Sequence, residues 1–240
     1  MAEVIPAIIP KTFSELNQKL DLISGIAEVV HIDILDGKMT AEKSWPNINA
    51  PDSNFVKIIR EEEAFPFSEN IEYEVHLMVE NPEEYIQQWI SAGAKRIIVH
   101  IESFENPQKA LEFVYRFNDQ YGGDGSFLVT ELGIAIKATT DYALLETLIP
   151  EVDFIQCMSI NDIGSQGQAF DETVIPKIKK LREMNPDLPI SVDGSVNIDT
   201  AQKLVDVDVD RLIVGSAIFK SGNILGTIEE LESLVPTPRN

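Results

Sequence analysis

The chain alternates between short apolar runs rich in β-branched residues and longer stretches in which apolar positions recur with helical spacing. Several helical stretches follow a capping residue, such as Thr12 before Phe13. The short runs are apolar on both faces, which is typical of parallel strands covered by helices. Eight such runs occur, at residues 4–9, 29–35, 73–79, 96–101, 132–137, 154–160, 189–194 and 211–217.

Alternation of strands and helices predicts parallel strands joined by right-handed crossovers. Eight such units in 240 residues, with no change of composition along the chain, predict one α/β domain over residues 1–240, a single (β/α)8 (TIM) barrel. A doubly wound sheet is the alternative, but it does not normally need eight strands in this length. We expect a loop and a short helix in the irregular segment 36–71, and a further helix in DYALLETLI at 141–149.

Composition restricts the partners. Forty acidic against nineteen basic residues give a net charge of −21, which repels nucleic acid and anionic lipid. The sequence contains no run of eighteen apolar residues, so no membrane span is predicted. The first ten residues lack the pattern of a secretion signal. The single cysteine, Cys157, fits a reducing compartment. We expect a cytoplasmic homo-oligomer that acts on a small molecule.

Four ionisable side chains interrupt the strand-like runs near their ends. His31 and Asp33 are two residues apart and therefore share one face, and His76 and Asp193 stand late in two other runs. In a barrel these positions converge on the C-terminal mouth. Burying two imidazoles and two carboxylates without compensation costs several kcal/mol, and one divalent cation would satisfy all four. Mixed nitrogen and oxygen donors favour Zn, Mn, Fe or Co over Mg or Ca. A His/Asp hydrogen-bonded network without an ion is the alternative.

Three further inward positions are candidates for the pocket lining. Met78 and Met158 either fill the core or provide an apolar wall for a reactive intermediate. His100 also ends a strand, and without a neighbouring inward carboxylate we interpret it as a pocket or packing residue.

Glycines follow the last three strands, in the segments 161–168, 193–197 and 214–219. Backbone amides that are free of bulky side chains bind phosphate without lysine, and loops after strands seven and eight often form the phosphate site of a barrel. Gly164 and Gly167 of the first segment are candidates for this role.

The motifs HIDILDG, HLMV, SVDG and GSAIF, in this order over nearly the whole chain, resemble the ribulose-phosphate 3-epimerase family. The resemblance implies a ribulose-phosphate-binding barrel and an isomerase of pentose phosphate and carbohydrate metabolism. It implies that D-ribulose 5-phosphate and D-xylulose 5-phosphate are interconverted at C3 through a metal-stabilised enediolate. Asp33 and Asp193 would be the acid/base pair, one on each face of the substrate.

The resemblance also makes His31, Asp33, His76 and Asp193 the metal ligands. It assigns phosphate binding to two dipeptides, Gly194-Ser195 and Gly215-Ser216. The chain departs from the family at Ala7 in the pocket lining, where serine is usual, and in the loops 38–48 and 161–168. These positions would meet the substrate.

Three other functions are open. The altered loops favour an epimerase of a six-carbon ketose phosphate such as allulose 6-phosphate. An aldolase or decarboxylase could use Lys137 as a Schiff base, but the decarboxylase pattern Asp-x-Lys-x-x-Asp is absent at Asp33 to Asp36. A non-catalytic sugar-phosphate-binding barrel is the third, although an idle barrel has no reason to keep four costly polar groups.

Overall fold

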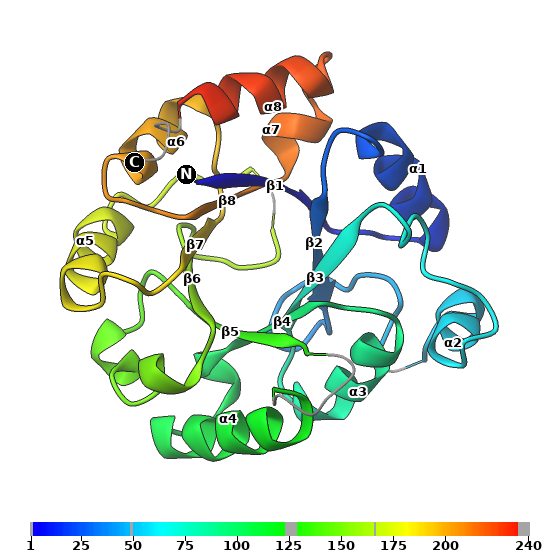
Figure 1. Cartoon of the computed structure of the whole chain (residues 1–240), viewed down its shortest axis with the longest axis horizontal. Coiled ribbons are helices and arrows are strands. Elements are labelled where there is room, and N and C mark those ends of the chain that lie inside the picture. Colours follow the sequence, from blue (N-terminus) through cyan, green and yellow to red (C-terminus); the bar gives the residue numbers. More distant parts are fainter. Residues whose placement is uncertain (1, 49, 123–128, 166, 235–240) are drawn as a thin grey trace.

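A computed structural model describes residues 2–48, 50–122, 129–165 and 167–234. Eight parallel strands close into a barrel in sequence order, with helices outside it (Figure 1). The prediction of a (β/α)8 barrel is therefore confirmed. The strands are β1 (Glu3–Ile8), β2 (Val29–Leu35), β3 (Glu72–Met78), β4 (Arg96–His100), β5 (Glu131–Ile136), β6 (Phe154–Met158), β7 (Ile190–Asp193) and β8 (Arg211–Val214).

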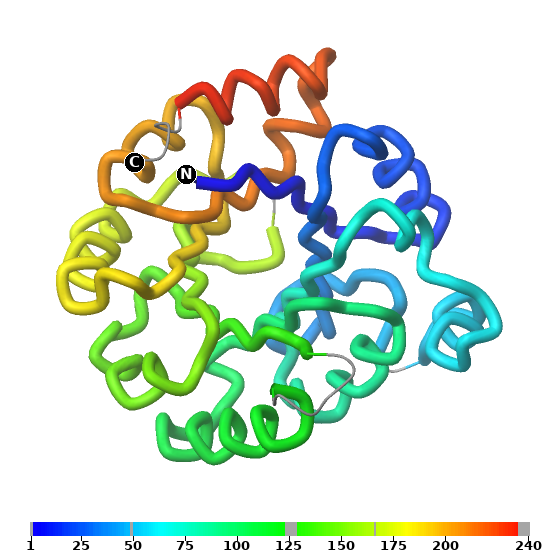
Figure 2. The backbone as a smooth tube through the Cα atoms, in the orientation of Figure 1, coloured from blue at the N-terminus to red at the C-terminus, as the bar shows by residue number. Residues whose placement is uncertain are grey.

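The helices surround the barrel, and α8 returns to pack beside α1 and β1, which closes the ring (Figure 2). They are α1 (Phe13–Ile23), α2 (Ser53–Ile59), α3 (Glu83–Ser91), α4 (Pro107–Tyr121), α5 (Val174–Met184), α6 (Ile198–Val205), α7 (Ser216–Phe219) and α8 (Ile224–Ser233). Short 3₁₀ helices are η1 (Ile101–Ser103), η2 (Tyr142–Leu145) and η3 (Ile149–Glu151). None of the helices in the described part of the chain is long and apolar enough to cross a bilayer.

Strand alternation divides the core into two parts. Outward residues of each strand, such as Ile32 and Val75, join the large apolar layer between barrel and helices. Cys157 lies in this layer too, as its position in the strand predicts. Inward residues form smaller apolar clusters, one around Ile5 and Ile213 and another at the mouth. A third cluster contains Ile98, Ala135 and Phe154. Polar side chains take other inward positions, among them His31, His76 and Gln156, so the barrel interior carries the candidate chemistry.

The expected helix at 141–149 is wrong. That segment forms η2 and η3, separated by a turn. Pro150 lacks an amide hydrogen and its ring would clash with the preceding helical turn, so one α-helix cannot run through both pieces. The side chain of Asp141 caps η2 by accepting a hydrogen bond from the amide of Ala143.

Candidate metal centre and substrate cavity

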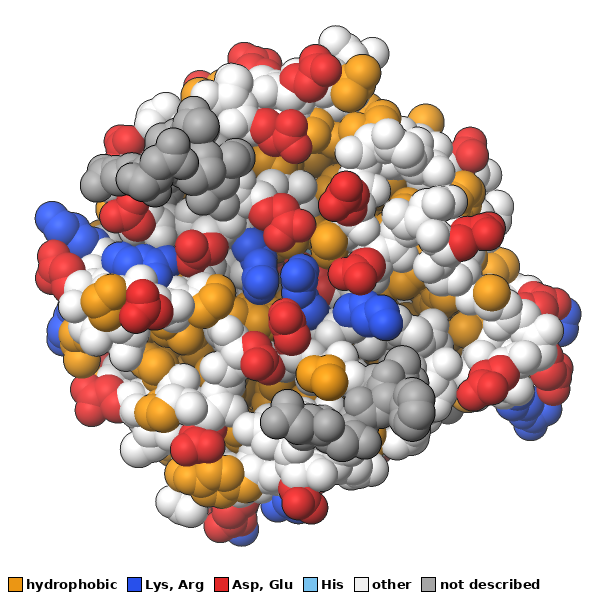
Figure 3. Space-filling view, in the orientation of Figure 1, with side chains coloured by type: hydrophobic (Ala, Val, Ile, Leu, Met, Phe, Trp, Pro, Cys, Tyr) orange, Lys and Arg blue, Asp and Glu red, His pale blue; other side chains and the backbone are white. Residues whose placement is uncertain are grey.

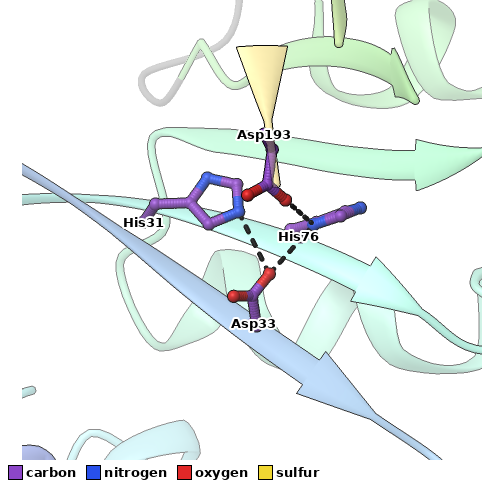
Figure 4. Close-up of side chains that lie close together, drawn as sticks. All are labelled: His31, Asp33, His76 and Asp193. Carbon is purple, nitrogen blue, oxygen red and sulfur yellow. Dashed lines mark hydrogen bonds and ion pairs between the residues drawn. The ribbon is translucent and has the colours of Figure 1, made fainter. Parts of the chain in front are cut away.

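Four side chains from three strands meet inside the barrel near its mouth (Figure 4). Asp33 Oδ1 lies 3.2 Å from His31 Nε2 and 3.0 Å from His76 Nδ1. Asp193 Oδ2 lies 3.6 Å from His76 Nδ1. Register explains the first group, because Asp33 on β2 pairs directly with His76 on β3. Closure of the barrel brings β7 to the same point, so the four residues that the sequence singled out are adjacent.

One donor atom from each of the four lies within 4.8 Å of the others. Both histidines are fully buried, and Asp33 is 5% exposed. Two imidazole nitrogens and two carboxylate oxygens suit one divalent ion of the Zn, Mn, Fe or Co type. This donor set therefore fits the metal that the sequence predicts.

Glu74 orients His31 from behind. Its Oε1 lies 2.6 Å from His31 Nδ1, and its Oε2 accepts a hydrogen bond from Arg96 Nη1 at 3.1 Å. A carboxylate can only accept, so His31 carries a proton on Nδ1, and its Nε2 faces Asp33. Carboxylates behind metal-binding histidines commonly have this arrangement. Burial acts to lower the pKa of His31, but the charge of Asp33 and the hydrogen bonds to Asp33 and Glu74 raise that pKa well above its usual range. Without an ion Nε2 is therefore protonated too, and a bound ion would take the place of that proton. Glu74 was not singled out from the sequence, although its inward position two residues before His76 would have pointed to it.

The charges at this centre are unbalanced. Burial raises the pKa of Asp193 to about 7, and the negative charge of Asp33 contributes to the rise. Burial also acts to raise the pKa of Asp33, but the charge and hydrogen bond of His31 outweigh it and hold that pKa well below its usual range. Burial lowers the pKa of His76 to about 4, so its ring is neutral and keeps a lone pair. Two close carboxylates and a neutral imidazole attract a cation.

A cavity of about 570 Å³ opens above the four residues at the C-terminal mouth. Asp33 and Asp193 reach its surface, together with Ala7, Met78 and Met158. Among the described residues that line it, none is lysine or arginine, and Lys137 is not one of them. An anionic substrate would therefore have to bind to backbone amides. A bound cation would neutralise the two carboxylates.

The other side of the cavity is built from the loops that follow β6, β7 and β8. All six residues expected to meet a phosphate line it: Gly164, Gly167, Gly194, Ser195, Gly215 and Ser216. Gln166 of the first loop lies outside the described residues.

Two of these glycines are required by the backbone. Gly164 has φ +79°, and a Cβ there would lie 2.3 Å from the side chain of Leu35. Gly194 has φ +112°, and its Cβ would lie 2.8 Å from Ile160. Ser195 also has positive φ, at 52°, and its hydroxyl donates a hydrogen bond to the carbonyl oxygen of Gln168. This bond joins the loops after β6 and β7.

His100 is a packing residue, one of the two roles expected for it, and does not line the pocket. It is fully buried behind His76, with 2.9 Å between the two Nε2 atoms, and it is not among the residues that line the cavity. It also has a carboxylate partner, because Glu102 Oε2 lies 2.9 Å from His100 Nδ1. This partner could not be read from the strand pattern because Glu102 follows the strand, in η1, where strand alternation no longer applies.

Gln156 on β6 is a second residue of the centre that the sequence reasoning missed. Its amide nitrogen lies 3.3 Å from His76 Nδ1 and 3.4 Å from Asp193 Oδ2. Its inward position two residues before Met158 was the available signal.

A closed parallel barrel with four possible metal ligands beside glycine-rich loops defines the class: a TIM barrel with a candidate metal centre at its C-terminal mouth. The family model described as "Ribulose-phosphate 3 epimerase family" matches residues 3–219. The chain belongs to this family.

Curated relatives agree with that assignment. Ribulose-phosphate 3-epimerase of Aquifex aeolicus is 30% identical over 89% of this chain and 87% of its own. The enzyme of the same name from Bacillus subtilis is 28% identical over 96% and 98%.

Solved structures share the fold at low identity. The 3-hexulose-6-phosphate synthase of Salmonella typhimurium has a TM-score of 0.64 at 14% identity, covering 97% of this chain and 98% of that one. The orotidine 5'-monophosphate decarboxylase of Sulfolobus solfataricus has a TM-score of 0.60 at 14% identity, covering 98% of both chains.

Proposed function

We propose that this protein is a metal-dependent epimerase that interconverts D-ribulose 5-phosphate and D-xylulose 5-phosphate by proton transfer at C3. The observation that carries the proposal is the arrival of Asp33 and Asp193 from different sides of the barrel at one cavity floor. Inversion at carbon needs a proton removed from one face and returned to the other. Two carboxylates that flank a flat intermediate can do this, and their roles exchange in the back reaction.

The remaining residues bind and orient. His31, Asp33, His76 and Asp193 would hold a divalent ion, which would supply positive charge where negative charge develops on the substrate oxygens. Amides of Gly194, Ser195, Gly215 and Ser216 would hold the phosphate, since α7 begins at Ser216 without a side-chain cap. Met78 and Met158 would cover the reacting carbons and exclude water.

The proposal includes a cytoplasmic homo-oligomer, which rests on the sequence alone. The substrate preference rests on family membership, and the altered loops make a six-carbon ketose phosphate the nearest competitor.

The test incubates metal-loaded protein with D-ribulose 5-phosphate in D₂O and follows deuterium by NMR. Deuterium at C3 with formation of D-xylulose 5-phosphate is the expected result. Exchange at C1 would indicate an aldose–ketose isomerase instead. Absence of exchange from a fully loaded, folded protein would leave a binding barrel.

Two parallel reactions test the six-carbon substrate and the Schiff-base mechanism. Faster turnover of D-allulose 6-phosphate would move the substrate to six carbons. A mass increase after borohydride reduction with substrate would indicate an imine, for which Lys137 is the candidate.

A further inference from the structure

The outer nitrogen of His76 is part of a buried hydrogen-bond chain that the proposed reaction does not use. His76 Nε2 faces His100 Nε2 at 2.9 Å, and His100 Nδ1 faces Glu102 Oε2 at 2.9 Å. Both imidazoles are fully buried. These hydrogen bonds lead away from the cavity, so neither His100 nor Glu102 is placed to touch a substrate.

The contacts of Glu102, at the far end of these hydrogen bonds, determine which atom donates in each of them. Glu102 Oε1 accepts hydrogen bonds from the backbone amide of Lys137 at 2.9 Å and from the hydroxyl of Thr140 at 2.6 Å. Burial acts to raise the pKa of Glu102, but its contacts with His100, Thr140 and the backbone amide of Lys137 hold that pKa at about 2, so Glu102 is a carboxylate. Its other oxygen must then accept from His100, which places the proton of His100 on Nδ1.

The proton positions follow one another from this point. The contact between the two Nε2 atoms needs one donor and one acceptor, and a His100 ring that carries only the proton on Nδ1 offers a lone pair on Nε2. That lone pair can only accept, so His76 donates from its own Nε2. The Nδ1 atom of His76 is then left with a lone pair directed at Asp33, 3.0 Å away. A lone pair facing a carboxylate is unfavourable unless a cation lies between them, and this is the centre where the four donors converge.

The second histidine of the centre is arranged by the same logic. Glu74 places the proton of His31 on Nδ1 and leaves Nε2 for the centre. The two rings therefore present different nitrogens, Nε2 of His31 and Nδ1 of His76, and each choice is made by a carboxylate outside the centre. Glu74 acts directly, whereas Glu102 acts through one intervening imidazole.

We propose that His100 and Glu102 are positioning residues that fix the tautomer of His76, so that its Nδ1 is ready to bind the divalent ion. The inference rests on the metal site of the proposed function. It gives His100 a role in ion affinity and none in contact with substrate.

The first test measures Zn²⁺ affinity by competition with a chelating dye. His100→Phe keeps a ring but removes both hydrogen bonds, and we expect affinity to fall roughly 10- to 100-fold, as for other partners behind metal ligands. His100→Gln is the conservative variant, because its amide oxygen accepts from His76 and its amide nitrogen donates to Glu102. We expect the Zn²⁺ affinity of His100→Gln to lie within about threefold of the wild-type value, far closer than that of His100→Phe.

Ile98→Val is the matched packing control, since Ile98 is a fully buried inward residue two positions earlier on β4. It shortens a core side chain without touching the chain of hydrogen bonds. We expect unchanged Zn²⁺ affinity for Ile98→Val.

The second test reads the tautomers directly in the wild-type protein. With three histidines in the sequence, long-range ¹H–¹⁵N spectra of the imidazoles can be assigned by single substitutions. We expect His100 protonated on Nδ1 only, and His76 protonated on Nε2 with Zn²⁺ on Nδ1.

The outcomes separate the two proposals. Wild-type protein that binds no divalent ion contradicts the metal site itself. Wild-type protein that binds Zn²⁺ while His100 carries its proton on Nε2, or while His100→Phe binds as tightly as His100→Gln, overturns the positioning role and leaves the metal site intact.

Discussion

Acidic residues lie at both ends of the barrel interior, but the positively charged partners of these residues differ. At the N-terminal end, Arg96 binds Glu74 and Glu131, and Arg211 lies 3.8 Å from Glu3. Figure 3 views this face, and basic side chains lie at its centre among acidic ones. At the C-terminal mouth, Asp33 and Asp193 share a cavity whose described lining has no lysine or arginine.

This contrast shows where the protein tolerates unpaired charge. At the base, the buried carboxylate of Glu74 is neutralised by Arg96, so its charge has a protein partner. Carboxylates at the mouth have no lysine or arginine among the described lining residues, and the protonated ring of His31 is the positive charge beside Asp33. A divalent ion could take the place of the proton on its Nε2. Glu74 connects the two ends, because it binds Arg96 with one oxygen and His31 with the other.

The largest effect should come from the mouth. Asp193→Asn keeps the shape of the side chain but removes one of the two proton-transfer groups, and we expect turnover to fall about 10⁴-fold. Stability should not fall, because the like charge beside Asp33 is removed. Steady-state assays and urea unfolding measure the two quantities. A variant with nearly full activity would mean that the two ends do not differ in function.

Breaking an ion pair at the base should affect stability instead. Arg96→Met leaves Glu74 buried without its arginine, and we expect the free energy of unfolding to fall by about 3 kcal/mol. Arg116→Met is the control, since its pair with Glu83 is exposed on both sides and should contribute less than about 1 kcal/mol. Urea denaturation compares them. Equal losses would show that the buried pair of Arg96 and Glu74 stabilises the protein no more than an exposed ion pair does.

Adding and removing a divalent ion tests whether the four residues at the mouth bind one. Zn²⁺ at one hundred times its dissociation constant should stabilise the folded protein by about 2.7 kcal/mol, and a chelator should reverse this. Thermal melts with and without ion measure the shift. Asp33→Asn replaces an anionic donor by a neutral amide oxygen and should show a smaller shift at the same Zn²⁺ concentration. An equal shift would place the ion elsewhere.

The smallest effect is expected at the solvent edge of the base. Glu131→Gln removes the partner of Arg96 whose side chain is 44% exposed, while Glu74 keeps its contact with the same arginine. We expect a loss below about 1 kcal/mol in urea unfolding, because solvent screens this pair. A loss as large as that of Arg96→Met would show that Glu131, and not Glu74, is the main partner.

Much of the candidate site was accessible to the sequence because strands place side chains with a period of two. His31, Asp33, His76 and Asp193 could be identified as inward polar residues, and the glycine-rich segments as loops after the last strands. The same rule would have found Glu74 and Gln156. It could not find Glu102, which lies in a 3₁₀ turn, and helical spacing misread residues 141–149, where Pro150 interrupts the helix.

The sequence by itself determined the barrel, the inward positions and the family, because periodicity and motif order are local properties of the chain. Only the tertiary structure decided which inward groups meet. Closing the sheet sets β7 against the residues of β2 and β3, and the pairing of β3 with β4 places Arg96 beside Glu74 and His100 behind His76. Those contacts join residues far apart in sequence, and hydrogen bonds between them fix which nitrogen of each histidine faces the centre.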